Sequence, residues 1–274
     1  MQRDNYLKGI VKEAWREEIE KYLQQMILTC LLDVKKAKVL FLPGPHAYEL
    51  EIYLRLGFKI ENLVGLERSE SREKTISKRN PLLNVVQMDS SDFVYESKEQ
   101  FDVISFDTEN MFNEKQVDTI DTLFRRRLIS PHGIVILNYF EGHTSKRDKD
   151  FLLGKYKGVN LFEARRLAPI ETLQNNFLRH KLSFEMQCIA YRSPSPMFTV
   201  AAWYSKKPIV KTARELLVNT VSLGSEKRFT EVYKHAITTP KQLRMLSKKL
   251  GTDEDCLYNS IVSGYNFDFK ELVA

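Results

Sequence analysis

The sequence has few cysteines and no long apolar run. Its 274 residues include three cysteines, which are odd in number and far apart: Cys30, Cys188 and Cys256. This usage excludes a disulfide framework and a zinc motif, so we expect reduced thiols in a cytoplasmic protein. No apolar segment approaches a membrane span, and the N-terminal stretch is too charged for a secretory signal. The five histidines form no pair at metal-ligand spacing, so no metal is predicted.

Acidic residues are scarce in the middle of the chain. Residues 1–124 carry 17 Lys and Arg against 22 Asp and Glu, whereas residues 125–207 carry 15 against 6 and residues 208–274 carry 10 against 8. A basic surface attracts polyanions, so the region 125–207 indicates nucleic acid as a partner. The alternative is that these lysines and arginines simply lie on solvent-exposed helix faces and bind no specific partner.

Glycine is also sparse, and the breaks that exist separate alternating strands and helices. Apolar residues at helical spacing predict a helix over residues 6–32, from Tyr6 to Leu31. Apolar strand-like runs follow at residues 38–43, 62–67, 83–89, 101–107 and 133–140, with helical patterns between them. Near-continuous apolar strands that alternate with helices predict a parallel sheet covered on both faces.

The pattern changes after residue 140. Residues 144–182 favour helix with breaks at Gly154, Gly158 and Pro169, and the segments 183–193 and 197–207 read as an antiparallel hairpin. From residue 208 the chain favours helix. We therefore predict an α/β domain over residues 1–207, with a doubly wound, mostly parallel seven-stranded sheet closed by an antiparallel hairpin. Residues 208–274 form a small helical C-terminal region.

Polar groups follow four successive strands of the predicted sheet. They are the turn Pro43, Gly44, Pro45 and His46, then Glu67, then Asp89 with Ser90, and then Asp107. Ligands of open parallel sheets bind beyond the carboxyl ends of the strands. Glu67 lies 23 residues past Gly44, near the offset of ~20 residues for a carboxylate that accepts hydrogen bonds from ribose hydroxyls. An Asp after the third strand can accept from an amine such as adenine N6, so the set predicts a nucleoside ligand.

With these parts in this order, residues 8–207 resemble the class I S-adenosylmethionine-dependent methyltransferases: a leading helix, five strand–helix units and a terminal hairpin that inserts a reversed strand. The resemblance implies S-adenosyl-L-methionine as cofactor. It places residues 42–46 against the methionine portion, Glu67 and Arg68 at the ribose and Asp89 with Ser90 at the adenine. Asp107 and Thr108 would line the methyl donor and the substrate entrance.

The first loop departs from that family, because L-P-G-P-H-A has one glycine and no acidic residue at the strand tip. A methionine moiety has no phosphates and needs less exposed backbone than a pyrophosphate, so the loop favours the methyl donor over a dinucleotide. It is also compatible with a degenerate site that binds nothing, or with a plain strand–helix turn stiffened by Pro43 and Pro45.

The segment after the fourth strand, FDTENMF, lacks the motifs that this family uses for base amino groups or for carbon-5 of cytosine. Asp107, Glu109 and Asn110 are the candidates to orient an acceptor. Alternatively, Asp107 and Thr108 cap the next helix. His143 is a further acid–base candidate, and Tyr139 could stack on a base or simply pack.

The C-terminal residues 240–264 have the layout helix, glycine turn, helix, which is that of a helix-turn-helix. The second helix begins with acidic residues, so we favour a helical bundle that docks on the main domain, on a protein partner or on a second copy. The preferred hypothesis is methyl transfer from S-adenosylmethionine to a nucleic acid. The alternatives are a non-catalytic binding protein that keeps the fold, and a small-molecule methyltransferase.

Overall fold

The structure, a computed structural model, describes residues 2–44, 46–108, 111–142, 145–193, 195–206 and 211–222. Its strands are β1 (Val39–Phe41), β2 (Leu63–Leu66), β3 (Asn84–Val86), β4 (Phe101–Asp107), β5 (Ile129–Phe140), β6 (Phe184–Ser193), β7 (Ser195–Tyr204) and β8 (Val221–Ser222). Its helices are α1 (Gln2–Cys30), α2 (Tyr48–Arg55), α3 (Glu70–Arg79), α4 (Ser90–Glu96), α5 (Glu114–Arg125), α6 (Lys146–Lys155), α7 (Leu161–Arg179) and α8 (Ala213–Val218), with a 3-10 turn at Ile60–Asn62.

The strands form one mixed sheet in the order β3-β2-β1-β4-β5-β7-β6-β8. Strands β1 to β5 pair in parallel, and β7 runs antiparallel to both β5 and β6. The hairpin therefore inserts a reversed strand into the sheet, as predicted. The sheet has the seven expected strands and gains the two-residue β8 at its edge, in a segment that we expected to be helical. The leading helix, the parallel strands that alternate with helices and the reversed hairpin strand, which were the basis of the resemblance, are all present.

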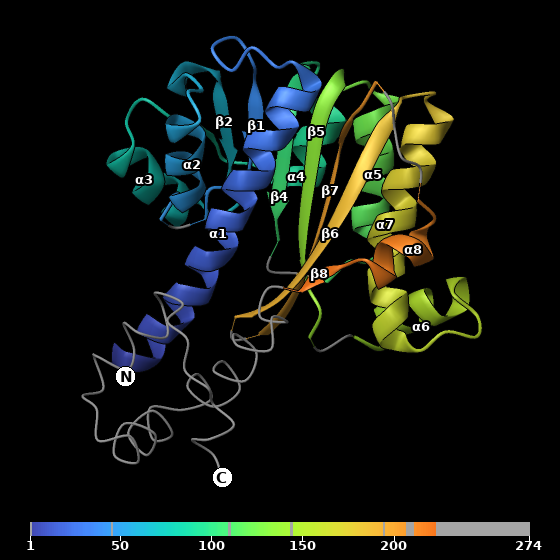
Figure 1. Cartoon of the computed structure of the whole chain (residues 1–274). Helices are drawn as coiled ribbons and strands as arrows, with labels where there is room; N and C mark the ends of the chain where they lie inside the picture. The colour runs from blue at the N-terminus through green and yellow to red at the C-terminus, as the bar shows by residue number, and fades with distance from the viewer. Residues whose placement is uncertain are drawn as a thin grey trace, which may run out of the picture.

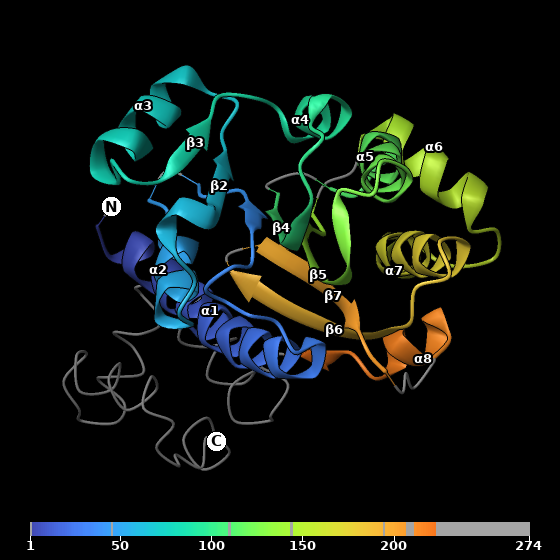
Figure 2. The ribbon, with the colours of Figure 1, turned by 90° about the horizontal axis from the view of Figure 1, so that it is seen from above.

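Two helical layers cover the sheet, and each encloses its own apolar core. Figures 1 and 2 show α1 and α2 on one face and α4, α5 and α7 on the other. The first core joins α1, α2 and Ile76 of α3 to the sheet. The second core joins α4, α5, α6, α7 and α8 to the opposite face. The short segment 211–222, which we placed with the C-terminal region, thus packs on the sheet through Leu216 and β8. The predicted helix-turn-helix at 240–264 lies outside the described residues.

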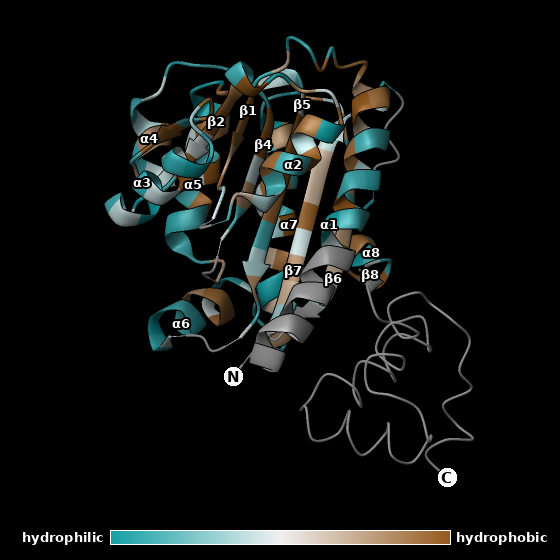
Figure 3. Cartoon of the chain, turned by 90° about the vertical axis from the view of Figure 1, so that its left-hand side faces the viewer, coloured by the Kyte–Doolittle hydropathy of each residue, from teal (hydrophilic) through white to brown (hydrophobic). Residues whose placement is uncertain are grey.

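Helix α1 packs on the sheet through one apolar stripe. Within residues 15–30, its buried apolar side chains are Trp15, Ile19, Leu23, Met26, Ile27 and Cys30. Their spacing keeps them on one face of a helix, and Figure 3 shows hydrophobic and hydrophilic bands alternating along the coloured, C-terminal part of α1. The predicted helix is confirmed, but Leu31 does not belong to the stripe. It lies beyond the end of the helix with φ of +54° and is 72% exposed.

Two of the three breaks expected in residues 144–182 are wrong, because Gly154 lies in the last turn of α6 and Pro169 lies inside α7. A further proline, Pro131, lies within β5, where the register of β5 against β4 shifts between Ile129 and Ile134. An irregularity of this kind tolerates a proline because no ladder hydrogen bond is required of it. Pro169 lies inside α7, which runs through it unbroken. The lost backbone bond is outweighed there by burial of the neighbouring Ala168 and Ile170. Gly158, with φ of +85°, does separate α6 from α7.

No helix in the described ranges combines the length and the apolar character needed to cross a membrane.

Two leucines of α1 provide a matched test of how this helix is held. Leu23 is 1% exposed in the core, whereas Leu28 is 70% exposed. We expect Leu23→Ala to lower the free energy of unfolding by about 2–5 kcal/mol, because it leaves a cavity under the helix. Leu28→Ala should change it by no more than about 0.5 kcal/mol. Urea unfolding of both variants measures the difference, and equal losses would show that α1 does not dock through this stripe.

Candidate functional site

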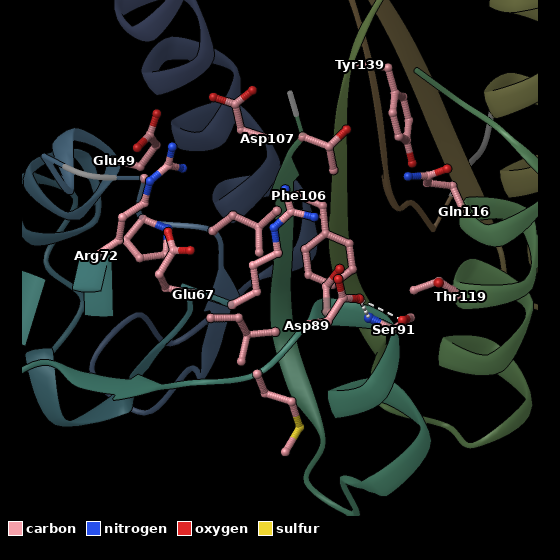
Figure 4. Close-up of a pocket in the computed structure, with 18 of the residues that line it drawn as sticks. Glu49, Glu67, Arg72, Asp89, Ser91, Phe106, Asp107, Gln116, Thr119 and Tyr139 are labelled. Atoms are coloured by element: carbon pink, nitrogen blue, oxygen red, sulfur yellow. Dashed lines mark hydrogen bonds between the residues drawn. The ribbon is translucent and has the colours of Figure 1, made fainter. Parts of the chain in front are cut away.

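A cavity of about 550 Å³ opens at the carboxyl ends of β1, β2 and β4. We call it the rim cavity. Nine residues predicted from the strand ends line it: Pro43, Gly44, His46, Glu67, Arg68, Asp89, Ser90, Asp107 and Thr108. Figure 4 shows Glu67, Asp89 and Asp107 around this one hollow. The predicted Pro45, Glu109, Asn110 and His143 lie outside the described residues. The structure thus brings the predicted residues to one place, and their roles toward a ligand stay predictions.

The first loop turns sharply through two residues with positive φ. Gly44 has φ of +58°, and Ala47, which precedes α2, has φ of +51°. A second glycine supports the loop from the neighbouring strand. A Cβ on Gly65 of β2 would lie 3.1 Å from Cγ of Pro43. Since that distance is shorter than an ordinary contact, the bare backbone of β2 lets Pro43 pack down beside the cavity.

Glu67 extends the edge of β2 into the cavity wall. Its backbone N–H donates to Val86 and its carbonyl accepts from Met88, so the pairing with the β3 segment continues past the strand end. The side chain is buried, and its Oε1 accepts a hydrogen bond of 2.8 Å from the Ser69 N–H. An ionised carboxylate offers about four acceptor positions, so this bond orients the group and leaves capacity for ligand hydroxyls.

Asp89 is the N-cap of α4. Its Oδ1 accepts from the Ser91 N–H at 3.0 Å, from the Ser91 hydroxyl at 2.7 Å and from Lys115 Nζ at 3.1 Å. Partial burial disfavours the charged form, but the bonds from Ser91 and the charge of Lys115 outweigh it and lower the pKa of Asp89. The carboxylate is therefore held ionised beside the cavity.

Asp107 and Thr108 belong to the end of β4 and do not cap the next helix. The N-cap of α5 is Asn113, which forms a capping box with Gln116. Thr108 instead donates its N–H and its hydroxyl to the carbonyl of Asn138. Asp107 Oδ1 accepts a hydrogen bond of 2.6 Å from the Asn138 amide. The capping alternative is therefore wrong, and Asp107 remains at the cavity wall.

The helices contribute charged groups that the strand ends did not reveal. Arg16 of α1, Glu49 of α2, Arg72 of α3 and Lys115 of α5 all line the rim cavity. Arg16 and Glu49 form an ion pair with 4.0 Å between Nε and Oε1, and the Arg16 guanidinium lies 4.2 Å from the centre of the Tyr48 ring. This nitrogen is buried with no hydrogen-bond partner among the described residues. In the sequence, Arg16 was marked only by its position next to Trp15 in the apolar stripe of α1, which did not identify it as a cavity residue.

The basic region 125–207 is divided between two edges of the sheet. Helix α5 starts at the cavity edge after β4 and ends near the start of β5, so Arg125, Arg126 and Arg127 lie at the opposite edge (Figure 1). Helix α6 follows the end of β5 and carries Lys146, Arg147 and Lys149, which are exposed, at the cavity edge. The count of charged residues over 125–207 could not distinguish these two groups, because it does not record the edge at which each residue lies.

No cluster of three or more His, Cys, Asp or Glu side chains suited to a metal ion occurs among the residues that the structure describes.

Comparisons with known proteins show distant similarity of fold. No protein-family model and no curated protein matches the chain. A solved structure described as a methylase from Haemophilus influenzae is 11% identical, with 69% of this chain and 99% of that chain covered and a TM-score of 0.43. A SAM-dependent methyltransferase from Agrobacterium tumefaciens is 12% identical over 70% and 62%, with a TM-score of 0.45. Similarity at this level establishes no shared activity.

The lowered pKa of Asp89 gives stability a definite pH dependence. Since the folded-state pKa lies below the unfolded value of about 3.9, the ionised group stabilises the fold above about pH 4. This contribution disappears as the pH falls through the folded-state pKa. We expect Asp89→Asn, which retains an N-cap, to be less stable than the unchanged chain at pH 7, with the gap closing toward pH 3. Urea unfolding at both pH values measures the gap, and a gap that widens in acid would contradict the assignment.

Proposed function

We propose that this chain binds S-adenosylmethionine in the rim cavity and transfers its methyl group to an acceptor. The observation that supports this most is the open cavity with Glu67, Asp89 and Asp107 at three strand ends of a methyltransferase fold. Its volume of about 550 Å³ lies within the ~300–1,000 Å³ of small-molecule pockets.

The residues of the cavity match the parts of this ligand. Glu67 is placed to accept from the two ribose hydroxyls, and the Asp89 turn to accept from the adenine amine. Arg16 lines the cavity, and its guanidinium suits the carboxylate of the amino-acid arm. Glu49 comes from the first turn of α2 and lines the same cavity. It supplies there the acidic group that the strand tip lacks, and it suits the ligand ammonium.

When bound, the sulfonium supplies a methyl group for an in-line displacement. Such a step needs alignment of the acceptor more than a covalent group on the protein. Asp107 lies at the end of β4 with its carboxylate oriented by Asn138, so it is the described side chain best placed to hold an acceptor.

The acceptor that we favour is a nucleic acid. The cations of α6 stand at the same edge as the cavity, and the exposed Phe162 at the start of α7 holds the Arg166 guanidinium 4.2 Å from its ring centre. Basic residues beside an exposed ring are suited to phosphates and stacked bases. Arg166 is paired with Glu141 and Arg147 with Glu114, so Lys146 and Lys149 of α6 carry most of the electrostatic part of this proposal.

The cofactor is tested by removing the predicted ribose acceptor. Glu67→Ala should weaken binding of S-adenosylhomocysteine at least about tenfold, because hydrogen bonds to a charged group contribute ~1.5–3 kcal/mol. Glu70→Ala is the matched control: Glu70 is exposed on the neighbouring helix and does not line the cavity. Calorimetric titration gives both affinities. No binding by the unchanged chain would favour the non-catalytic alternative, and an unaltered affinity in Glu67→Ala would remove this residue from the site.

The acceptor is tested by two charge-matched triple variants. Lys146, Arg147 and Lys149 are replaced by Gln in one chain, and Arg125, Arg126 and Arg127 in the other. Both lose three positive charges, so only location differs. We expect the first to bind a labelled single-stranded RNA about tenfold more weakly with a shallower salt dependence, and the second to change little. Fluorescence anisotropy over a salt series measures both. Equal effects would reduce the binding to net charge alone.

A further inference from the structure

A row of polar side chains crosses the apolar layer between the sheet and α1. Asp107 of β4 stands beside Asn138 of β5 in the parallel register, and Asn138 stands beside Thr199 of β7 in the antiparallel register. Trp15 of α1 covers the row, and Tyr191 of β6 stacks on its ring at 5.4 Å. We call Trp15, Thr199, Asn138 and Asp107 the relay. Asn138 is 1% exposed and Thr199 is fully buried.

The relay is linked by hydrogen bonds from end to end. Trp15 Nε1 donates to Thr199 Oγ1 at 3.1 Å, and the Thr199 hydroxyl donates to Asn138 Oδ1 at 2.8 Å. The Asn138 amide nitrogen donates to Asp107 Oδ1 at 2.6 Å and to the Tyr191 hydroxyl oxygen at 2.7 Å. These bonds connect α1 and the strands β6, β7 and β5 to the Asp107 carboxylate of β4 at the cavity wall.

The indole of Trp15 determines the donor-to-acceptor direction of every hydrogen bond in the relay. An indole N–H can only donate, so the Thr199 oxygen must accept from Trp15 and turn its own hydrogen elsewhere. That hydrogen reaches Asn138 Oδ1, which excludes the flipped amide. Asn138 must therefore present its two N–H groups to Asp107 and Tyr191. Burial, reinforced by the charge of Asp107, raises the pKa of Tyr191 well above its usual value, so this phenol stays neutral.

Burying such a row of polar side chains costs free energy that packing alone would not require. Each buried amide or hydroxyl loses its hydration, and apolar residues of similar shape could fill the same layer. The relay ends on the one carboxylate of the row that reaches the cavity. We propose that Asn138, with its amide oriented by Thr199 and Trp15, is a positioning residue that holds the Asp107 carboxylate in its ligand-facing orientation. The inference rests on the proposed function, because Asp107 is assigned there to the methyl donor and acceptor.

The first test needs no ligand and uses the two tryptophans of the chain, Trp15 and Trp203. Asp107→Asn should shift the indole N–H resonance of Trp15 in a nitrogen–proton correlation spectrum, because the bonds between them are coupled. Trp203 serves as internal reference. Glu67→Gln, which alters another carboxylate of the same cavity, is the matched control and should leave the Trp15 signal in place. A Trp15 signal that ignores Asp107→Asn would overturn the proposal.

The second test measures coupling in ligand binding. Thr199→Val removes the hydroxyl with little change of shape. As a single substitution, we expect it to weaken S-adenosylhomocysteine binding about tenfold. In the Asp107→Asn background the same substitution should cost no further affinity, and Thr199→Ser should retain binding. Equal losses in both backgrounds would mark the relay as merely structural. If the unchanged chain does not bind the ligand, the proposed function fails, and the Trp15 resonance alone still decides whether the relay orients Asp107.

Discussion

The site depends on the parallel pairing of β2, β1, β4 and β5. Parallel strands end at a common edge, so the pairing brings Gly44, Glu67 and Asp107 to one cavity although they are far apart in the chain. The register matters as much as the direction. A slip of one residue between β4 and β5 would turn Asp107 from the α1 face to the apolar core under α5. The polar row of Asp107, Asn138 and Thr199 opposes that slip, because any other register would leave its groups buried without partners.

The sequence predicted the parts of this arrangement that have a local cause. An apolar run followed by a turn and a helix is legible from a few residues, and the residue after each strand then has a known place in a parallel sheet. The seven main strands, the reversed hairpin strand and the lining positions Glu67, Asp89 and Asp107 could therefore be located without coordinates. The breaks misplaced at Gly154 and Pro169 have the opposite cause. Glycine and proline disfavour the helices that they occupy here, and tertiary packing overrides that local preference.

The groups that the sequence could not supply are those set by how helices dock. Arg16 reaches the cavity only because Trp15 and its stripe fix the rotation of α1 on the sheet. Glu49 does so because α2 begins directly behind the first loop. The two halves of the basic region could not be separated either, since charge counted along the chain does not record at which end of a strand or helix each residue lies. The partners of Asn138 were hidden for the same reason: they depend on register across three strands.

The single glycine of the first loop is explained by its surroundings. Gly44 and Ala47 adopt the two left-handed conformations of the loop, and Pro43 packs against the side-chain-free backbone of Gly65. The loop therefore reaches the cavity edge without a glycine-rich sequence. Glu49, in the first turn of α2, places a carboxylate in the lining of the same cavity. Arg16 of α1 and Glu49 form an ion pair with 4.0 Å between Nε and Oε1, so helix docking places one group of each charge beside the first loop.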